Sequence, residues 1–141
     1  MEIKQLTAAT EDAARDLSRL ASELHTDERT MSLEQLQTIV DDKNIVLMVA
    51  IDEGKIIGMG ANYTIRKIAS TKCYMEDLIV DDSYRGKGIG GQLIQKLIDS
   101  ARAEGARSLE FMTATHRTDA HRFYEKLGFT NKDRFVYKMT L

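Results

Sequence analysis

Four glycines occupy six consecutive positions in the stretch VDDSYRGKGIGGQL, residues 80–93 of this chain. Glycine is the least favourable ordinary residue in a helix, costing about 1 kcal/mol per position relative to alanine. A strongly periodic helical pattern nevertheless begins at Ile89 and continues to Ala101. Because so many glycines weaken the start of that helix, we expect the loop backbone to approach something that a side chain would block.

The apolar pattern predicts ten elements in the order β-α-α-β-β-β-α-β-α-β. Helices are expected after the N-caps Thr10 and Ser32, from Ile89 to a stop at Gly105, and over 119–127. Strands are expected over 2–8, 44–52, 56–65, 73–80, 107–114 and 134–141. Hairpin-connected strands followed by strand–helix alternation indicate an α/β (α+β) fold with a mixed sheet and helices on its faces.

Composition limits the classes of function. A chain of 141 residues is expected to form one domain, residues 1–141, and its net charge of −2 gives no general attraction to nucleic acid or membranes. The N-terminal stretch MEIKQLTAAT resembles no signal peptide and no apolar run could span a bilayer, so we expect a cytoplasmic protein. The single cysteine excludes an internal disulfide and a cysteine zinc cluster, and the three histidines lack metal-ligating spacing, so no metal is expected.

The glycine loop has several interpretations. Gly86, Gly88 and Gly91 satisfy the dinucleotide fingerprint G-x-G-x-x-G, but DDSYR separates the preceding strand from the first glycine, and no Walker A string is present. Arg85, Gly88 and Gly90 instead read R-x-x-G-x-G between a strand and a helix. That arrangement offers backbone amides and a helix N-terminus to a phosphate. The remaining alternative is a solvent-exposed turn with basic residues for solubility.

Two motifs together resemble the GNAT superfamily of N-acetyltransferases. MEDLIVDDSYRGKGIGGQLIQKLIDSAR is similar to the family's acetyl-CoA-binding motif, and DAHRFYEKLGF, residues 119–129, to its second motif. The resemblance implies a mixed, centrally splayed sheet flanked by helices, and acetyl-CoA as co-substrate. It implies that the pyrophosphate lies on the glycine loop, that the pantetheine arm pairs with the preceding strand and that the second motif flanks the coenzyme. The coenzyme-binding residues would be Ile79, Val80, Arg85, Gly86, Lys87, Gly88, Ile89, Gly90, Gly91, Arg117 and His121.

Two positions depart from the family pattern. Arg117 stands where the family often has asparagine, and Asp82 replaces the proline of a common Asp-Pro pair. In place of the contact usually made from the first position, Arg117 is expected to offer its guanidinium to a phosphate.

The chemistry requires a base, because an alkyl ammonium with a pKa near 10.4 is almost entirely protonated at pH 7. Glu76 and Asp77 lie on the strand that leads into the loop, and we prefer Glu76, with Asp77 as the alternative. A bulged or splayed strand near Ile79 would offer an amide to the oxyanion. By resemblance, Tyr124 would protonate the leaving thiolate, although its spacing also fits a core aromatic.

The acceptor is the least constrained part of the prediction. The second half of the chain is most similar to small-molecule acetyltransferases of the aminoalkylphosphonate type, so we expect a small-molecule primary amine and no nucleic-acid or membrane partner. A protein lysine or N-terminal acetyltransferase and a non-catalytic acyl-CoA-binding module are the alternatives, and the resemblance implies a homodimer. An anionic acceptor could be clamped by basic residues, or these could be ordinary surface charges: Arg29, Arg66, Lys67 and Arg134.

Overall fold

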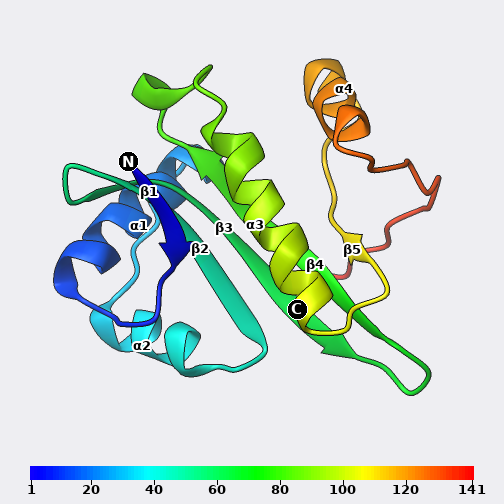
Figure 1. Cartoon of the computed structure of the whole chain (residues 1–141), viewed down its shortest axis with the longest axis horizontal. Coiled ribbons are helices and arrows are strands. Elements are labelled where there is room, and N and C mark those ends of the chain that lie inside the picture. The colour runs from blue at the N-terminus through cyan, green and yellow to red at the C-terminus, as the bar shows by residue number, and fades with distance from the viewer. The chain divides into compact units, whose positions relative to one another are not determined.

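The computed structural model describes all residues, 1–141, and forms two compact units, residues 1–111 and residues 112–141. The first unit contains a five-stranded sheet in the order β1-β2-β3-β4-β5 (Figure 1). Strands β1 to β4 are antiparallel neighbours, and β5 runs parallel to β4. The strands are β1 Glu2–Gln5, β2 Ile45–Asp52, β3 Lys55–Arg66, β4 Thr71–Val80 and β5 Leu109–Glu110. The predicted mixed sheet is confirmed.

Three helices of this unit begin where the sequence predicted, and the third also ends as predicted. Helix α1, Glu11–His25, follows Thr10, whose hydroxyl accepts a hydrogen bond from the Ala13 amide at 3.1 Å. Helix α2, Leu33–Asp41, starts with a reciprocal capping box between Ser32 and Gln35. Helix α3, Ile89–Ala103, is followed by Gly105 in the left-handed region at φ 73°.

The sheet is buried on both faces. Helices α1 and α2 pack on one face through Leu17, Leu20 and Leu36, which are fully buried. On the other face, Gly58 and Gly60 of β3 lie under α3 (Figure 1). A Cβ at either glycine would come within 3.2 Å and 3.0 Å of leucine methyl groups of α3, so glycine allows the helix to approach the strand closely.

The first unit differs from the sequence prediction at its last strand. A strand was expected over residues 107–114, and β5 contains only Leu109 and Glu110. These two residues pair with Cys73 and Tyr74, so β5 has no paired residue along β4 beyond Tyr74.

The second unit contains helix α4, Thr118–Lys126, as predicted, and Gly128 at φ 95° follows its end. The closing strand predicted over 134–141 is wrong: residues 130–141 form no helix or strand and all are exposed. The alternating apolar pattern there is strand-like, but a strand becomes stable only through pairing and packing, which local sequence does not guarantee.

Candidate active site

The glycine loop connects β4 to α3 through a short 3₁₀ turn, η1, Asp82–Tyr84. Gly86 and Gly88 both adopt left-handed backbone conformations, with φ near 77° and 76°. Gly88 is the N-cap of α3. Residues other than glycine rarely adopt these backbone conformations. Backbone geometry therefore accounts for glycine at two of the four positions.

The backbone amides of the loop have no hydrogen-bond partner within the protein. The amides of residues 86–91 donate to no other group of the protein, and the first bond of α3 runs from Gln92 to the Gly88 carbonyl. A Cβ built at Gly86 or Gly88 would meet no atom within 4 Å. Unpaired amides at a helix N-terminus fit a phosphate group, so the loop has the groups needed to bind a diphosphate-bearing ligand.

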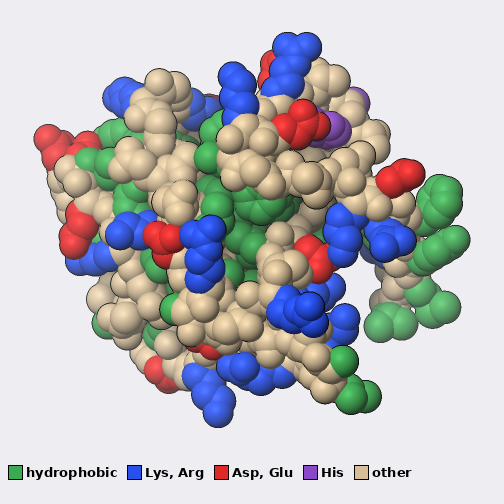
Figure 2. Space-filling model, turned by 45° about the vertical axis from the view of Figure 1, so that its right-hand side comes forward, with side chains coloured by type: hydrophobic (Ala, Val, Ile, Leu, Met, Phe, Trp, Pro, Cys, Tyr) green, Lys and Arg blue, Asp and Glu red, His purple; other side chains and the backbone are tan.

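The two basic side chains of the loop are already engaged. Arg85 pairs with Glu23 at 3.2 Å and with Asp82, and its Nε donates to the Val80 carbonyl at 3.0 Å. Lys87 lies over the Tyr84 ring, 4.9 Å from its centroid. Basic and acidic side chains are interspersed on the face that Figure 2 shows. Anion recognition therefore falls mainly to the backbone amides.

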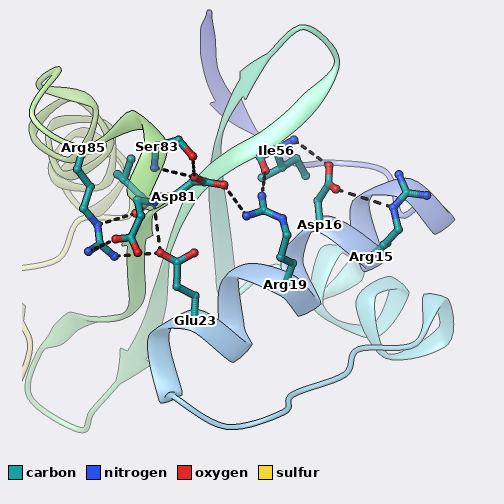
Figure 3. Close-up of polar contacts among 10 residues, drawn as sticks. Arg15, Asp16, Arg19, Glu23, Ile56, Asp81, Ser83 and Arg85 are labelled. Carbon is teal, nitrogen blue, oxygen red and sulfur yellow. Dashed lines mark hydrogen bonds and ion pairs between the residues drawn. The ribbon is translucent and has the colours of Figure 1, made fainter.

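Helix α1 fixes the end of β4 and the start of the loop (Figure 3). Arg19 binds the Asp81 carboxylate at 2.5 Å and the Ile56 carbonyl at 3.0 Å. Asp81 also accepts from the Ser83 amide and hydroxyl, and these bonds, with the nearby Arg19, hold the pKa of the Asp81 carboxyl below its usual range. One helix thus sets the position of the turn from which the glycine loop departs.

The replacement of proline by Asp82 has a structural role. The Asp82 amide donates to the Glu23 carboxylate at 3.2 Å, and proline has no N–H with which to do so. Glu23 therefore binds both the loop backbone and the Arg85 guanidinium. This departure from the family pattern anchors the loop to α1.

The end of β4 offers an open edge where the pantetheine arm was predicted to pair. Strand β5 contacts β4 only at Cys73 and Tyr74, several residues before Ile79 and Val80. Ile79 is buried against the α1 side of the sheet, whereas Val80 is half-buried. The pairing of the two parallel strands thus ends before these residues, and their splaying stays a prediction.

A bulge in β4 positions the candidate bases. Glu76 pairs with Ala61 and Ile79 with Met59, so Gly60 alone faces two residues of β4. Asp77 lies in this bulge with φ 59°, a left-handed conformation that is uncommon for a residue other than glycine. Regular alternation, which would place the two carboxylates on opposite faces, is interrupted here.

The two carboxylates share one electrostatic environment. Burial, and then repulsion from Asp77, raises the pKa of Glu76 above its usual value, while His25 opposes the shift. Burial together with both carboxylates raises the pKa of Tyr63 to about 12, so its hydroxyl stays protonated and donates to Asp77 at 3.5 Å. His25 Nε2 lies 3.9 Å from Asp77 Oδ1.

Three predicted site residues belong to the second unit. Tyr124 packs against Phe123 and Phe129, and burial raises the pKa of its hydroxyl. Arg117 is the N-cap of α4, and the His121 ring nitrogen Nε2 lies 2.9 Å from the Ala114 carbonyl. Their contacts with the coenzyme remain predictions.

Two of the basic residues considered as an anion clamp are paired with acidic side chains. Arg29 forms a bidentate pair with Asp27, and Arg66 pairs with Glu104. Arg66 is five residues beyond the β3 partner of Glu76, or about 17 Å along the strand. These two arginines are thus engaged at separate places on the first unit.

Known proteins resemble the chain along nearly its whole length. The model of the Acetyltransferase (GNAT) family matches residues 6–129. This chain belongs to the GNAT acetyltransferase family. It is 30% identical to an uncharacterised N-acetyltransferase of Bacillus subtilis, over 97% of this chain and 95% of the relative. It is also 32% identical to the aminoalkylphosphonate N-acetyltransferase of Salmonella typhimurium, over 62% and 58% of the two chains.

Structural comparison agrees with this assignment. An acetyltransferase of Trypanosoma brucei superposes with a TM-score of 0.82 over 99% of both chains, at 27% identity. The predicted family, fold class and N-acetyltransferase activity are thereby confirmed. GNAT acetyltransferases in general use acetyl-CoA. None of the helices of this acetyltransferase has the length and apolar character needed to span a membrane.

Several residues of the site carried no sequence signal. Arg19 and Glu23 are ordinary charged positions on an amphipathic helix, yet they hold the turn before the loop and the loop itself. Tyr63 and His25 come from different elements and meet only at Asp77. The spacings between these residues along the chain match no motif. They reach the site because helix α1 packs on the sheet.

Proposed function

We propose that this acetyltransferase transfers the acetyl group of acetyl-CoA to a primary amine of a small molecule, with the backbone of Arg85–Gly91 holding the pyrophosphate. The observation that supports this most directly is the row of unpaired amides from residue 86 to residue 91 at the N-terminus of α3. The N-terminal dipole of α3 adds about 0.3–2 kcal/mol for an anion there. A micromolar complex needs about −8 kcal/mol, so contacts along a long ligand must supply the rest.

The bound coenzyme supplies an activated acetyl thioester, and the protein must supply a neutral amine. Converting an alkyl ammonium to the neutral amine at pH 7 costs about 4–5 kcal/mol of free energy. Glu76 and Asp77 lie at the bulge just before the open edge of β4, where a proton acceptor is needed. The raised pKa of Glu76 makes its carboxylate a stronger base than an exposed one, which supports our preference for it.

Tyr124 is proposed to stabilise and protonate the leaving thiolate. Its raised pKa, caused by burial, keeps the phenol protonated at neutral pH. A protonated phenol is the form that donates a hydrogen bond to a sulfur anion. Arg117 and His121, at the start of α4, are proposed to contact the coenzyme.

A small-molecule acceptor is supported by the aminoalkylphosphonate-acetylating relative and by the pair of carboxylates at the bulge. The pairing of Arg29 and Arg66 with other acidic residues gives no support to a clamp for an anionic group. A cationic or neutral amine therefore fits the described charges better than an amine that also bears phosphate or phosphonate.

The test is thiol release from acetyl-CoA with a panel of acceptors: spermidine, glucosamine, glucosamine 6-phosphate, aminomethylphosphonate and a lysine-containing peptide. We expect turnover with one or more free amines and preference for those without a phosphate or phosphonate. Turnover with the peptide alone would favour a protein acetyltransferase. Binding of acetyl-CoA without turnover of any amine would favour a binding module and refute the proposal.

A further inference from the structure

His25 ends helix α1 beside the bulge of β4 and has no place in the chemistry described so far. Its Nε2 lies 3.9 Å from Asp77 Oδ1, and the Tyr63 hydroxyl donates to the other oxygen of the same carboxylate at 3.5 Å. Three elements, α1, β3 and β4, therefore bring one polar side chain each to a single point. The side chain of His25 is 42% exposed, so it is accessible to a ligand and to water.

Carboxylate–imidazole pairs activate nucleophiles in unrelated enzymes. At 3.9 Å, beyond hydrogen-bond distance, Asp77 forms an ion pair with His25 when the imidazole is protonated, and because Nε2 faces Asp77, Nδ1 is the nitrogen left to accept a proton. The last turn of a helix also favours a positive charge, because its carbonyl groups carry partial negative charge. His25 occupies the last turn of α1.

The charged groups around the ring support the same assignment. Asp77 and Glu76 of β4 and Asp27, just beyond α1, all interact electrostatically with His25, while Tyr63 of β3 is neutral. Asp27 is neutralised by Arg29, whereas no lysine or arginine forms an ion pair with Glu76 or Asp77. The acidic side chains around the ring therefore outnumber the basic side chains paired with them.

We propose that His25, in place of the Glu76 carboxylate preferred above, accepts the proton of the acceptor ammonium and that Asp77 holds the imidazole in place, an inference that rests on the acetyl transfer proposed above. The N–H bond of the ammonium breaks and its proton passes to Nδ1 of His25, while the electron pair stays on the nitrogen that attacks the thioester. The imidazolium is balanced by the Asp77 carboxylate and returns its proton to water. An imidazole ordinarily titrates about two pH units above a carboxylate, which makes it the stronger base near neutral pH.

The test compares His25→Gln with the wild-type enzyme and with His116→Gln, a change at an exposed histidine of the second unit. The assay uses the fastest amine of the panel at saturating acetyl-CoA, with kcat/KM for the amine measured from pH 6 to pH 10. We expect His25→Gln to lower kcat/KM about 10²-fold at pH 7, the usual contribution of a general base. The loss should shrink toward pH 10, where much of the amine is already neutral, while the KM for acetyl-CoA stays within twofold.

A double-mutant cycle tests the pairing. If Asp77 acts through His25, the variant carrying both Asp77→Asn and His25→Gln should lose no more activity than the worse single variant. A pH-independent loss in His25→Gln, or losses that multiply in the double variant, would overturn the inference. So would wild-type activity in His25→Gln, and that result would leave the proposed acetyltransferase function intact. Absence of turnover by the wild-type enzyme with every amine would overturn the proposed function, and this inference with it.

Discussion

The loop backbone, rather than its basic side chains, should determine coenzyme binding, and Gly88→Val tests this directly. Gly88 lies at φ 76°, and no atom lies within 4 Å of the position that a Cβ would take, so the valine side chain meets no steric clash in the protein. The cost to the fold is conformational, about 1–2 kcal/mol for an L-residue held in the left-handed region. The same Cβ would occupy the space in front of the amides that we assign to the pyrophosphate.

Gly54 provides a matched control. It lies at φ 79° in the turn between β2 and β3, also with no atom within 4 Å, and it belongs to no proposed site. Gly54→Val should therefore lose the same 1–2 kcal/mol, and both variants should melt about 2–8 °C below the wild type. Any difference between the two variants in the melting-temperature shift that acetyl-CoA causes then reports on the loop alone.

The assay is thermal unfolding with and without acetyl-CoA. At a ligand concentration of 100 times Kd, binding should stabilise the wild type and Gly54→Val by about 2.7 kcal/mol. Gly88→Val should show no such stabilisation. Equal coenzyme-induced shifts in both variants would refute the assignment of the phosphate site to this loop.

Three further predictions concern packing, pH dependence and the leaving group. Gly60→Ala places a Cβ 3.0 Å from a Leu97 methyl group, so urea denaturation should show a loss of about 1–3 kcal/mol; an unchanged midpoint would contradict the close approach of α3. The folded state lowers the pKa of Asp81, so the ionised carboxylate stabilises the fold above about pH 4. This stabilisation is lost as the pH falls through the lowered pKa. Asp81→Asn should therefore be less stable than the wild type at pH 7 by about 1–3 kcal/mol, and this gap should narrow in acid; a gap independent of pH would argue against the Arg19 pairing. Tyr124→Phe should lower kcat more than it raises the Kd for acetyl-CoA, measured by stopped assay and calorimetry, and equal effects would indicate a packing role.

Elements with strong local signals were predictable. The hydroxyl of Thr10 and the Ser32–Gln35 capping box mark helix starts because they satisfy amides that the helix itself leaves unpaired. The turn at Gly54 follows from the backbone conformation that only glycine adopts easily. The predicted strand over 134–141 failed for the opposite reason, since pairing partners lie outside the segment.

The candidate site was predictable only in part. The motif around Gly88 and Gly90 indicated the phosphate loop because its spacing is itself the chemical requirement. The sequence suggested Glu76 and Asp77 as bases, but strand alternation could not foresee the bulge at Asp77. The engagement of Arg85 by Glu23 was equally invisible, because the two residues are far apart along the chain.

The sequence by itself determined the family, the order of most elements and the bare backbone of the glycine loop. Each of these follows from short-range constraints: capping, hydrophobic period and the absence of a Cβ. Only the tertiary structure decided which charges remain available, because packing α1 on the sheet neutralises Arg85 with Glu23 and brings His25 to Asp77. Coulomb interactions depend on distance in space, and spacing along the chain does not specify it.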